Sequence, residues 1–271
     1  MSFSLLEKAD NIQAGQFSIF PQKGLEHAIS TRFGGVSQAP FDKMNLAMHN
    51  GDDKKSVLEN RKRFCNAFFL SSANLCTCEQ VHSSNIMQVT AVDAGRGAIS
   101  YEDAIKATDA LITNVKNVPL MLFFADCTPI LFFDPEHQAI GISHAGWKGT
   151  VHKIAQKTVQ AMQSAFHTDP KKCFVGIGPS IGPCCYEVGV DVQLQFRKAF
   201  PNDVNTILIP FQEKWKLDLW AANRIQLEEV GISKENIDMA HTCTACNSDV
   251  FFSYRADQGK TGRIAAMLCL K

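Results

Sequence analysis

Short apolar runs, separated by polar or turn-forming residues, make up most of the chain from about residue 25 to its end. Runs of this kind between turn signals are typical of β-strands. We expect strands over residues 25–31, 75–81, 86–92, 110–113, 120–124, 130–133, 139–143, 173–177 and 264–268. Several of these runs are apolar throughout, which predicts strands that are buried on both faces.

Apolar residues at helical spacing mark four further segments. We expect helices from Asp52 or Asp53 to Leu70, from Thr150 onward, over residues 190–199 and over residues 219–230. Asp218 is a suitable N-cap for the last of these helices. One face of the first helix carries Val57, Leu58, Phe64, Cys65, Phe68 and Phe69. Cys65 is therefore predicted to be a core residue.

Many short strands, few helices and no regular alternation of the two predict an α+β fold with mixed β-sheets. We expect the helices on the outside of the sheets, in a four-layer α/β/β/α arrangement. A length of 271 residues allows one domain or two. The chain contains no internal repeat, low-complexity tract or linker, so we expect a single domain over residues 1–271.

Charge and composition narrow the possible partners. The 27 basic and 27 acidic side chains balance to a net charge of zero and form no basic stripe, so we expect no nucleic-acid binding. Residues 1–13 lack the basic segment followed by an apolar segment that is typical of a signal peptide. The most apolar stretch, residues 118–133, contains Asp126 and Pro129 and is shorter than the roughly 20 apolar residues that cross a bilayer. We expect a cytoplasmic protein without a membrane partner, whose ten cysteines stay reduced.

Three good metal ligands each stand at the end of an expected strand: His82, Cys127 and His144. Strand ends are where a rigid core can direct side chains into a shared cleft. Two imidazoles and one thiolate make a three-ligand zinc set, which leaves the fourth tetrahedral position open for a reactant. The alternative is that Cys127 is a buried core thiol and the two histidines are ordinary loop residues, because these spacings are wide.

The segment from His144 to Thr150 contains Gly146, Lys148 and Gly149 at an expected strand-to-helix turn. Glycines at a helix start allow backbone N–H groups to meet an anion, and a lysine adds a positive charge there. A structural glycine turn with a solvated lysine is the alternative, because the segment matches neither a Walker nor a dinucleotide-binding motif.

Other residues give weaker signals. Arg32 and Arg255 are candidates for bidentate binding of a phosphate or sugar, although surface arginines are commoner than ligand clamps. Residues 178–187 contain Gly and Pro residues that make the backbone rigid, which suits either a pocket wall or a structural turn. Four thiols could supply a second, structural zinc site: Cys76, Cys78, Cys243 and Cys246.

Eight stretches together resemble a widespread bacterial family, now known as purine nucleoside phosphorylases and formerly as laccase-domain or multicopper polyphenol oxidases. They are Thr-Arg-Phe-Gly-Gly-Val-Ser at 31–37, the stretch from Asn45 to Asp53, Asn-Arg at 60–61, Gln-Val-His at 80–82, Ala-Asp-Cys-Thr-Pro at 125–129, His-Ala-Gly-Trp-Lys-Gly at 144–149, residues 178–187, and Phe-Ser-Tyr-Arg at 252–255. The resemblance extends from roughly residue 20 to the end of the chain and includes peptidoglycan editing factors.

The resemblance implies that His82, Cys127 and His144 are both the metal ligands and the catalytic residues. It implies a zinc-dependent purine nucleoside phosphorylase that acts on adenosine, inosine, guanosine and 5′-methylthioadenosine, with adenosine deamination at the same site. By position and family likeness, the substrate-binding residues are Arg32, Asn45, Gly146, Lys148, Gly149 and Arg255. Family members usually carry Arg where Lys148 stands, so the positive charge is kept here but the bidentate fork is lost.

Three other functions remain open at this point. Cys127 and His144 could act as nucleophile and base of an amide hydrolase that edits peptidoglycan precursors. The three ligands could instead buffer zinc or copper in a protein without catalytic activity. The older oxidase name requires a copper cluster, which is hard to build from eight histidines with no His-x-His pair. We expect nucleoside and phosphate as small-molecule partners and a monomer or small homo-oligomer.

Overall fold

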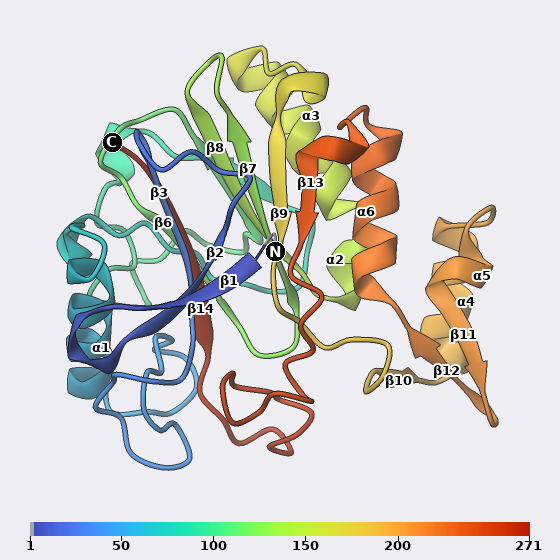
Figure 1. The fold of residues 1–271 in the computed structure, drawn as a ribbon, viewed down its shortest axis with the longest axis horizontal. Helices are drawn as coiled ribbons and strands as arrows, with labels where there is room; N and C mark the ends of the chain where they lie inside the picture. The colour runs from blue at the N-terminus through green and yellow to red at the C-terminus, as the bar shows by residue number, and fades with distance from the viewer. Residues whose placement is uncertain (1–2) are drawn as a thin grey trace.

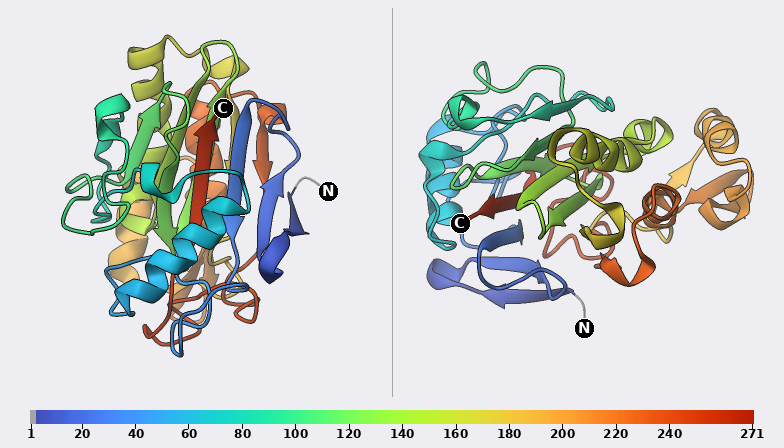
Figure 2. Two further views of the ribbon diagram at one scale, coloured as in Figure 1. Left: turned by 90° about the vertical axis from the view of Figure 1, so that its left-hand side faces the viewer. Right: turned by 90° about the horizontal axis from the view of Figure 1, so that it is seen from above.

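The computed structural model describes residues 3–271, and two large β-sheets packed face to face form its centre (Figures 1 and 2). The five-stranded sheet has the order β1-β2-β3-β14-β6 and is antiparallel throughout. Its strands are β1 (Phe3–Glu7), β2 (Gln13–Phe17), β3 (Leu25–Ser30), β6 (Leu120–Phe124) and β14 (Ile264–Leu270). The N-terminal hairpin of β1 and β2 has no counterpart among the expected strands, because Gly and Gln interrupt its apolar pattern.

The six-stranded sheet has the order β13-β9-β7-β8-β5-β4. Its strands are β4 (Ile86–Gln88), β5 (Ala110–Thr113), β7 (Thr128–Asp134), β8 (Ala139–Ala145), β9 (Phe174–Ile177) and β13 (Ile237–Met239). The outer pairs, β4 with β5 and β13 with β9, are parallel, and the inner pairs are antiparallel. The expectation of mixed sheets is therefore confirmed.

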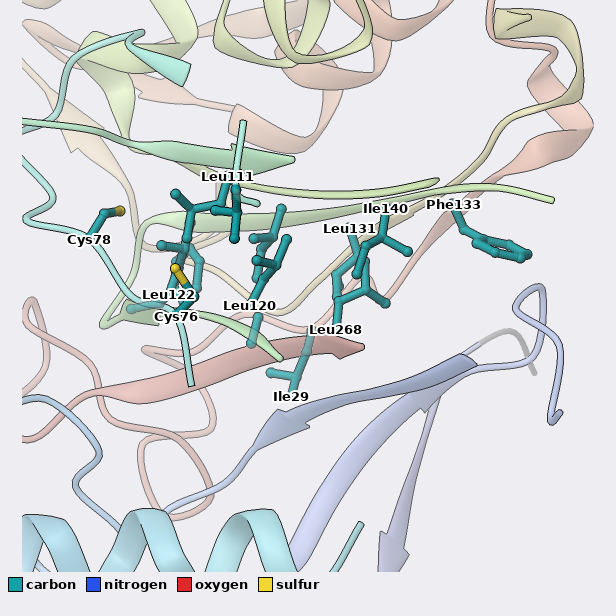
Figure 3. Close-up of a cluster of buried hydrophobic side chains, with 14 of the residues drawn as sticks. Ile29, Cys76, Cys78, Leu111, Leu120, Leu122, Leu131, Phe133, Ile140 and Leu268 are labelled. Atoms are coloured by element: carbon teal, nitrogen blue, oxygen red, sulfur yellow. The ribbon is translucent and has the colours of Figure 1, made fainter. Parts of the chain in front are cut away.

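Strand β6 shows why the sheets stack with helices outside them. Its side chains alternate in direction, as they must in a pleated strand. Leu120 and Leu122 face the six-stranded sheet and pack with Leu131 and Ile140, as Figure 3 shows. Met121 and Phe123 face the other way, against helix α1 (Lys54–Asn66). An amphipathic helix can thus cover the outer face of the sheet.

Helices cover both outer faces, so the four-layer α/β/β/α arrangement and the α+β class are confirmed (Figure 2). Helices α3 (Ile154–Phe166) and α6 (Leu219–Glu229) lie on the six-stranded sheet, opposite α1. As expected, Asp53 caps α1 by accepting from Ser56 N–H at 3.0 Å, and Asp218 caps α6. Cys65 is fully buried, also as expected.

Three expectations about these elements are wrong in detail. Phe69 is 90% exposed, because α1 ends before it and its backbone turns to a φ of +55°. The helix expected from Thr150 is two helices, α2 (Trp147–Val151) and α3, because Lys153 between them has a left-handed backbone with φ of +61°. Residues 75–81 form only isolated bridges, and the side chain of Gln80 bonds the backbone of Phe123 in place of a strand.

A smaller lobe lies beside α6, on the right in Figure 1. It consists of β10 (Glu187–Val188), α4 (Val190–Ala199), α5 (Val204–Ile207), β11 (Leu208–Phe211) and β12 (Lys214–Leu217). The lobe has its own apolar core, and Trp147 from α2 packs against that core. Within residues 3–271, no helix combines the length and the apolar character needed to cross a bilayer.

Candidate functional site

The fold brings His82, Cys127 and His144 together. Cys127 lies in the turn between β6 and β7, His144 lies near the end of β8, and His82 lies on the loop before β4. Their ligand atoms all lie within 4.8 Å of one another. Cys127 Sγ is 3.8 Å from His82 Nε2, and the two imidazole rings are 4.8 Å apart at 68°. Three side chains from distant parts of the sequence therefore form one compact donor group that could hold a metal ion.

One buried carboxylate, Asp109, orients two of these ligands. Its side chain is fully buried, directly before β5. His144 Nδ1–H donates to it at 2.8 Å, so the Nε2 atom of His144 is left free to bind a metal. The backbone N–H groups of Val81, His82 and Ser83 also donate to Asp109, at 3.2, 3.0 and 2.6 Å. A single side chain thus fixes the ring of His144 and the loop that carries His82.

The charges of the group favour an ionised thiol. Burial on its own would raise the pKa of Cys127, but the neighbouring His144 and His82 lower it to about 6. Burial on its own would lower the pKa of His144, but Cys127 and Asp109 raise it to about 9. Without a metal, the pair is therefore a thiolate beside an imidazolium at neutral pH. A metal ion that binds here displaces the proton from His144 Nε2.

The neighbour of Cys127, Asp126, connects the site to the loop before β14. Asp126 accepts hydrogen bonds from Thr244 Oγ1 at 2.6 Å, from Ser253 Oγ at 2.7 Å and from the backbone N–H of Arg255 at 2.7 Å. Asp126 is 8% exposed, so these bonds form away from bulk water, where a carboxylate needs partners. They hold residues 253–255 beside Cys127.

The donor group lies in a cavity of about 600 Å³, a volume typical of small-molecule sites. Apolar and aromatic side chains share its walls with cationic ones. The lining residues are His49, Gln80, His82, Phe123, Ala125, Asp126, Cys127, His144, Trp147, Lys148, Ile181, Tyr186, Leu219, Tyr254, Arg255 and Arg263. The cavity therefore offers rings on which a planar base can stack and cations that suit an anion.

The glycine turn lies directly against the donor group. A Cβ on Gly146 would come within 2.9 Å of both Cys127 Sγ and the ring of His82, so only glycine fits there. A Cβ on Gly149 would lie 3.1 Å from the carbonyl oxygen of Ser83, on the loop that carries His82. Close packing is thus a clear role of both glycines. Lys148 lies on the cavity wall, with Nζ 5.6 Å from the centre of the Trp147 ring.

The structure divides the three remaining predicted substrate-binding residues. Arg255 lines the cavity and donates to the carbonyl oxygens of Cys185 and Glu187, at 3.1 and 3.3 Å. Arg32 lies outside the lining, where it stacks on Phe252 and donates to the carbonyl oxygens of Asp42 and Ser248.

Asn45 also lies outside the lining. It is fully buried, and its Oδ1 accepts from the backbone N–H of Arg263 at 2.8 Å. The side chain of Arg263 lines the cavity. Asn45 therefore supports a cavity residue from behind the wall.

Sequence reasoning missed several residues of this site, among them Asp109, His49 and Arg263. Asp109 and Arg263 each stand immediately before a strand that was predicted, so the strand-end argument that selected His82 could have found them. His49 had no such signal, because its loop has no periodic pattern. Burial, with Arg263, Arg61 and His144 nearby, lowers the pKa of His49 to about 4, so it is a neutral side chain in the cavity at pH 7.

The predicted four-thiol group is wrong in its membership. Cys76 and Cys78 are buried in the core between the two sheets. The sulfur atoms of Cys243 and Cys246 instead lie close to those of Cys184 and Cys185. The close spacing of Cys76 with Cys78 and of Cys243 with Cys246 along the sequence carries no information about which loops lie together in space.

We expect Asp109→Asn to lower the affinity for zinc about 10- to 100-fold, the usual cost of losing a partner of a metal ligand. An amide cannot accept all the N–H groups that Asp109 accepts, so the His144 ring and the His82 loop lose their fixed positions. Competition with a chromophoric chelator measures the affinity. Asp134→Asn is the matched control, because Asp134 bonds His137 Nδ1 at 2.9 Å and its side chain is 1% exposed, but it lies outside the cavity. Equal zinc affinity in folded Asp109→Asn and wild-type protein would contradict the assignment.

We expect iodoacetamide to modify Cys127 in metal-stripped protein at a rate that rises through pH 6 and is level by pH 7. A lowered thiol pKa means that the thiolate is present above about pH 6, whereas an ordinary thiol ionises near pH 9. Mass spectrometry of the peptide that contains Cys127 gives the rate at each pH. Cys185 is an internal reference, because burial and its neighbouring thiols raise its pKa to about 11. Added zinc should protect Cys127, and a rate that rises only near pH 9 would refute the thiolate.

Comparison with known proteins identifies the family of the chain. A family model described as multi-copper polyphenol oxidoreductase laccase matches residues 26–271. Purine nucleoside phosphorylase YlmD of Geobacillus stearothermophilus is 38% identical over 252 residues, which cover 92% of this chain and 91% of that protein. Purine nucleoside phosphorylase YfiH of Escherichia coli is 34% identical over 252 residues, which cover 93% of this chain and 96% of that protein.

Two solved structures share the whole arrangement. The crystal structure of YlmD from Geobacillus stearothermophilus superposes with a TM-score of 0.93 at 35% identity and covers 98% of both chains. That of the Bacillus licheniformis hypothetical protein YfiH gives a TM-score of 0.93 at 33% identity and covers 98% of this chain and 99% of that one. The chain therefore belongs to the multi-copper polyphenol oxidoreductase laccase family, whose relatives described above are named purine nucleoside phosphorylases.

Proposed function

We propose that this protein is a zinc-dependent purine nucleoside phosphorylase, with His82, Cys127 and His144 as the metal ligands and as the centre of catalysis. The observation that carries the proposal is a three-ligand donor group in a cavity that also offers aromatic rings and cations. Three protein ligands leave one tetrahedral position for a reactant, as in catalytic zinc sites. The names of the curated relatives support the same reaction.

The donor set suits one zinc better than a copper cluster. Within residues 3–271, histidines occur in only one of the two groups that offer three or more metal ligands, and that group contains two of them, His82 and His144, beside Cys127. A multicopper centre needs many more imidazoles around adjacent metal positions. The thiolate and two imidazoles of this site also suit a single copper ion, which metal analysis distinguishes from zinc.

In the proposed reaction, a phosphate oxygen attacks C1′ of the ribose while the C1′–N9 bond breaks. The electron pair of that bond goes to N9 of the purine, which takes up the proton that the attacking phosphate loses, and the products are the free purine and ribose 1-phosphate. When bound, zinc supplies a positive centre that polarises phosphate, or water for deamination at purine C6. We propose adenosine, inosine, guanosine and 5′-methylthioadenosine as substrates, with adenosine deamination at the same site.

The side chains of the cavity divide naturally between the two reactants. Lys148 and Arg255 hold phosphate or ribose, together with backbone N–H groups of the turn that contains Gly146 and Gly149. Phe123, Tyr186 and Tyr254 provide rings on which the purine stacks. We infer the roles of these side chains from their positions in the lining, and the role of the glycine turn from its contact with the donor group.

Two predicted substrate-binding residues take indirect roles in this proposal. Asn45 supports Arg263, which adds a further cation to the cavity, and Arg32 fixes the loop over Phe252. We propose that the enzyme works as a monomer or small homo-oligomer in the cytoplasm, where an ionised thiol such as that of Cys127 stays reduced.

We expect the purified protein to convert adenosine and phosphate to adenine and ribose 1-phosphate. Cys127→Ser should lower the rate more than about 100-fold, which exceeds the usual cost of losing a side chain that only hydrogen-bonds a metal ligand. Chromatography follows the products, and metal analysis gives the zinc content of the same samples. Cys173→Ala is the matched control, because it removes a fully buried thiol in the core under α3. Zinc-loaded protein that leaves all four nucleosides unchanged would refute the proposal.

A second candidate function rests on the sequence of contacts from Cys127 to His144 to Asp109. Cysteine hydrolases use a thiolate nucleophile, a histidine base and a side chain that orients the base, and these three residues could take those parts in that order. An amide hydrolase of this type needs the thiolate without a metal. Activity on amide substrates that persists after chelation, and disappears in Cys127→Ser, would favour this candidate over the phosphorylase.

A further inference from the structure

A second group of four cysteines lies outside the cavity. Cys184 and Cys185 belong to the turn between β9 and β10, and Cys243 and Cys246 belong to the loop between β13 and β14. Their four sulfur atoms all lie within 4.8 Å of one another. Cys246 Sγ is 3.5 Å from Cys184 Sγ and 3.4 Å from Cys185 Sγ.

We propose that these four thiols bind a structural zinc ion that has no open coordination position. Four thiolates at Zn–S distances of about 2.3 Å form a tetrahedron whose sulfur–sulfur edges measure about 3.8 Å. The two shortest contacts of Cys246, 3.4 and 3.5 Å, lie close to this value, and all four sulfur atoms lie within 4.8 Å of one another. The Cys-x-x-Cys spacing of Cys243 and Cys246 is also one that structural zinc sites use.

A backbone hydrogen bond already points at one of the sulfurs. The N–H of Gly182 donates to Cys243 Sγ at 3.2 Å. An N–H group that donates to sulfur stabilises negative charge on that sulfur. Thiolates are the form that binds zinc, so Cys243 is prepared as a ligand.

The other sulfurs need a cation to ionise. Thiolates at the spacings of Cys184, Cys185 and Cys246 repel one another, because several negative charges cannot share so small a space. A divalent metal supplies the missing charge and deprotonates its thiol ligands, which release their protons to water.

A disulfide is a poorer explanation of the cluster. Cys246 is almost equally far from Cys184 and Cys185, whereas a disulfide joins one pair at about 2.0 Å and leaves the other two thiols without a role. Four mutually close sulfurs are instead what a tetrahedral metal site requires.

The position of the cluster indicates what the metal does. The turn that carries Cys184 also carries Ile181 and Tyr186, which line the cavity. The loop that carries Cys243 also carries Thr244, whose hydroxyl donates to Asp126 beside Cys127. The second zinc therefore fastens two pieces of the cavity wall together, and it does so whether or not the phosphorylase proposal holds.

Zinc analysis of five proteins, purified under reducing conditions without chelator, tests the second site. We expect two zinc ions per chain in the wild-type protein, one in Cys127→Ser, one in Cys246→Ser and none in the double variant. Cys173→Ala should keep both ions. The thermal midpoint of Cys127→Ser should fall on chelation, because a ligand bound only by the native state stabilises it. The midpoint of the double variant should not respond.

Cobalt substitution of Cys127→Ser decides the question even where a cluster variant fails to fold. A four-thiolate site gives intense charge-transfer absorption with tetrahedral ligand-field bands, which the cobalt form of Cys127→Ser should show. Cys127→Ser protein that binds neither zinc nor cobalt would overturn the proposal. So would zinc that persists in the folded double variant, or a disulfide among the four cysteines found by mass spectrometry of protein kept reduced.

Discussion

The carboxylate of Asp109 is the constraint on which the site depends. A buried negative charge is tolerated only where enough donors surround it, and the donors here come from two separate segments. The loop that carries His82 must turn its N–H groups toward Asp109, and His144 must present Nδ1–H to it. The same requirement therefore sets the path of a loop, the orientation of a ring and the tautomer that leaves Nε2 for a metal.

The two-sheet architecture explains why the third ligand arrives at the same point. Cys127 lies in the turn through which the chain passes from β6 in the five-stranded sheet to β7 in the six-stranded sheet. A short connection between stacked sheets joins strand ends that lie on the same side of the stack, and there His144, near the end of β8, pairs with Pro129 at the start of β7. Asp126 then fixes the loop before β14 against this turn. The rigid core thus places the donor group, and the loops complete the cavity around it.

The family description and the names of the relatives suggest different chemistry, oxidation by copper and phosphorolysis of nucleosides. The donor inventory bears on this difference directly. One compact group of two imidazoles and a thiolate, with an orienting carboxylate behind it, is the usual construction of a single-metal site. Aromatic and cationic walls add the features that a nucleoside and an anion need. The oxidase name therefore finds no support in the histidines of this cavity.

The sequence by itself determined the elements whose periodicity is local. Patterns of a few residues are enough to predict strands 110–113 and 120–124 and the helix caps Asp53 and Asp218. They also predict the amphipathic helices that cover the sheets. The group of His82, Cys127 and His144 could also be predicted as candidate metal ligands, because each stands at a predicted strand end, and the structure brings the three side chains together. The strand expected over residues 75–81 does not form, because the side chain of Gln80 bonds the backbone of Phe123 in its place.

Only the tertiary structure decided which residues meet. In the structure, Asp109 contacts His144 and the loop of His82. Arg32 and Asn45 lie outside the cavity lining. The thiols that lie near Cys243 are those of Cys184 and Cys185, and not those of Cys76 and Cys78. Each of these outcomes depends on contacts between segments far apart in the chain. Such contacts are fixed by the packing of the whole core and leave no local pattern, so no spacing within the sequence could reveal them.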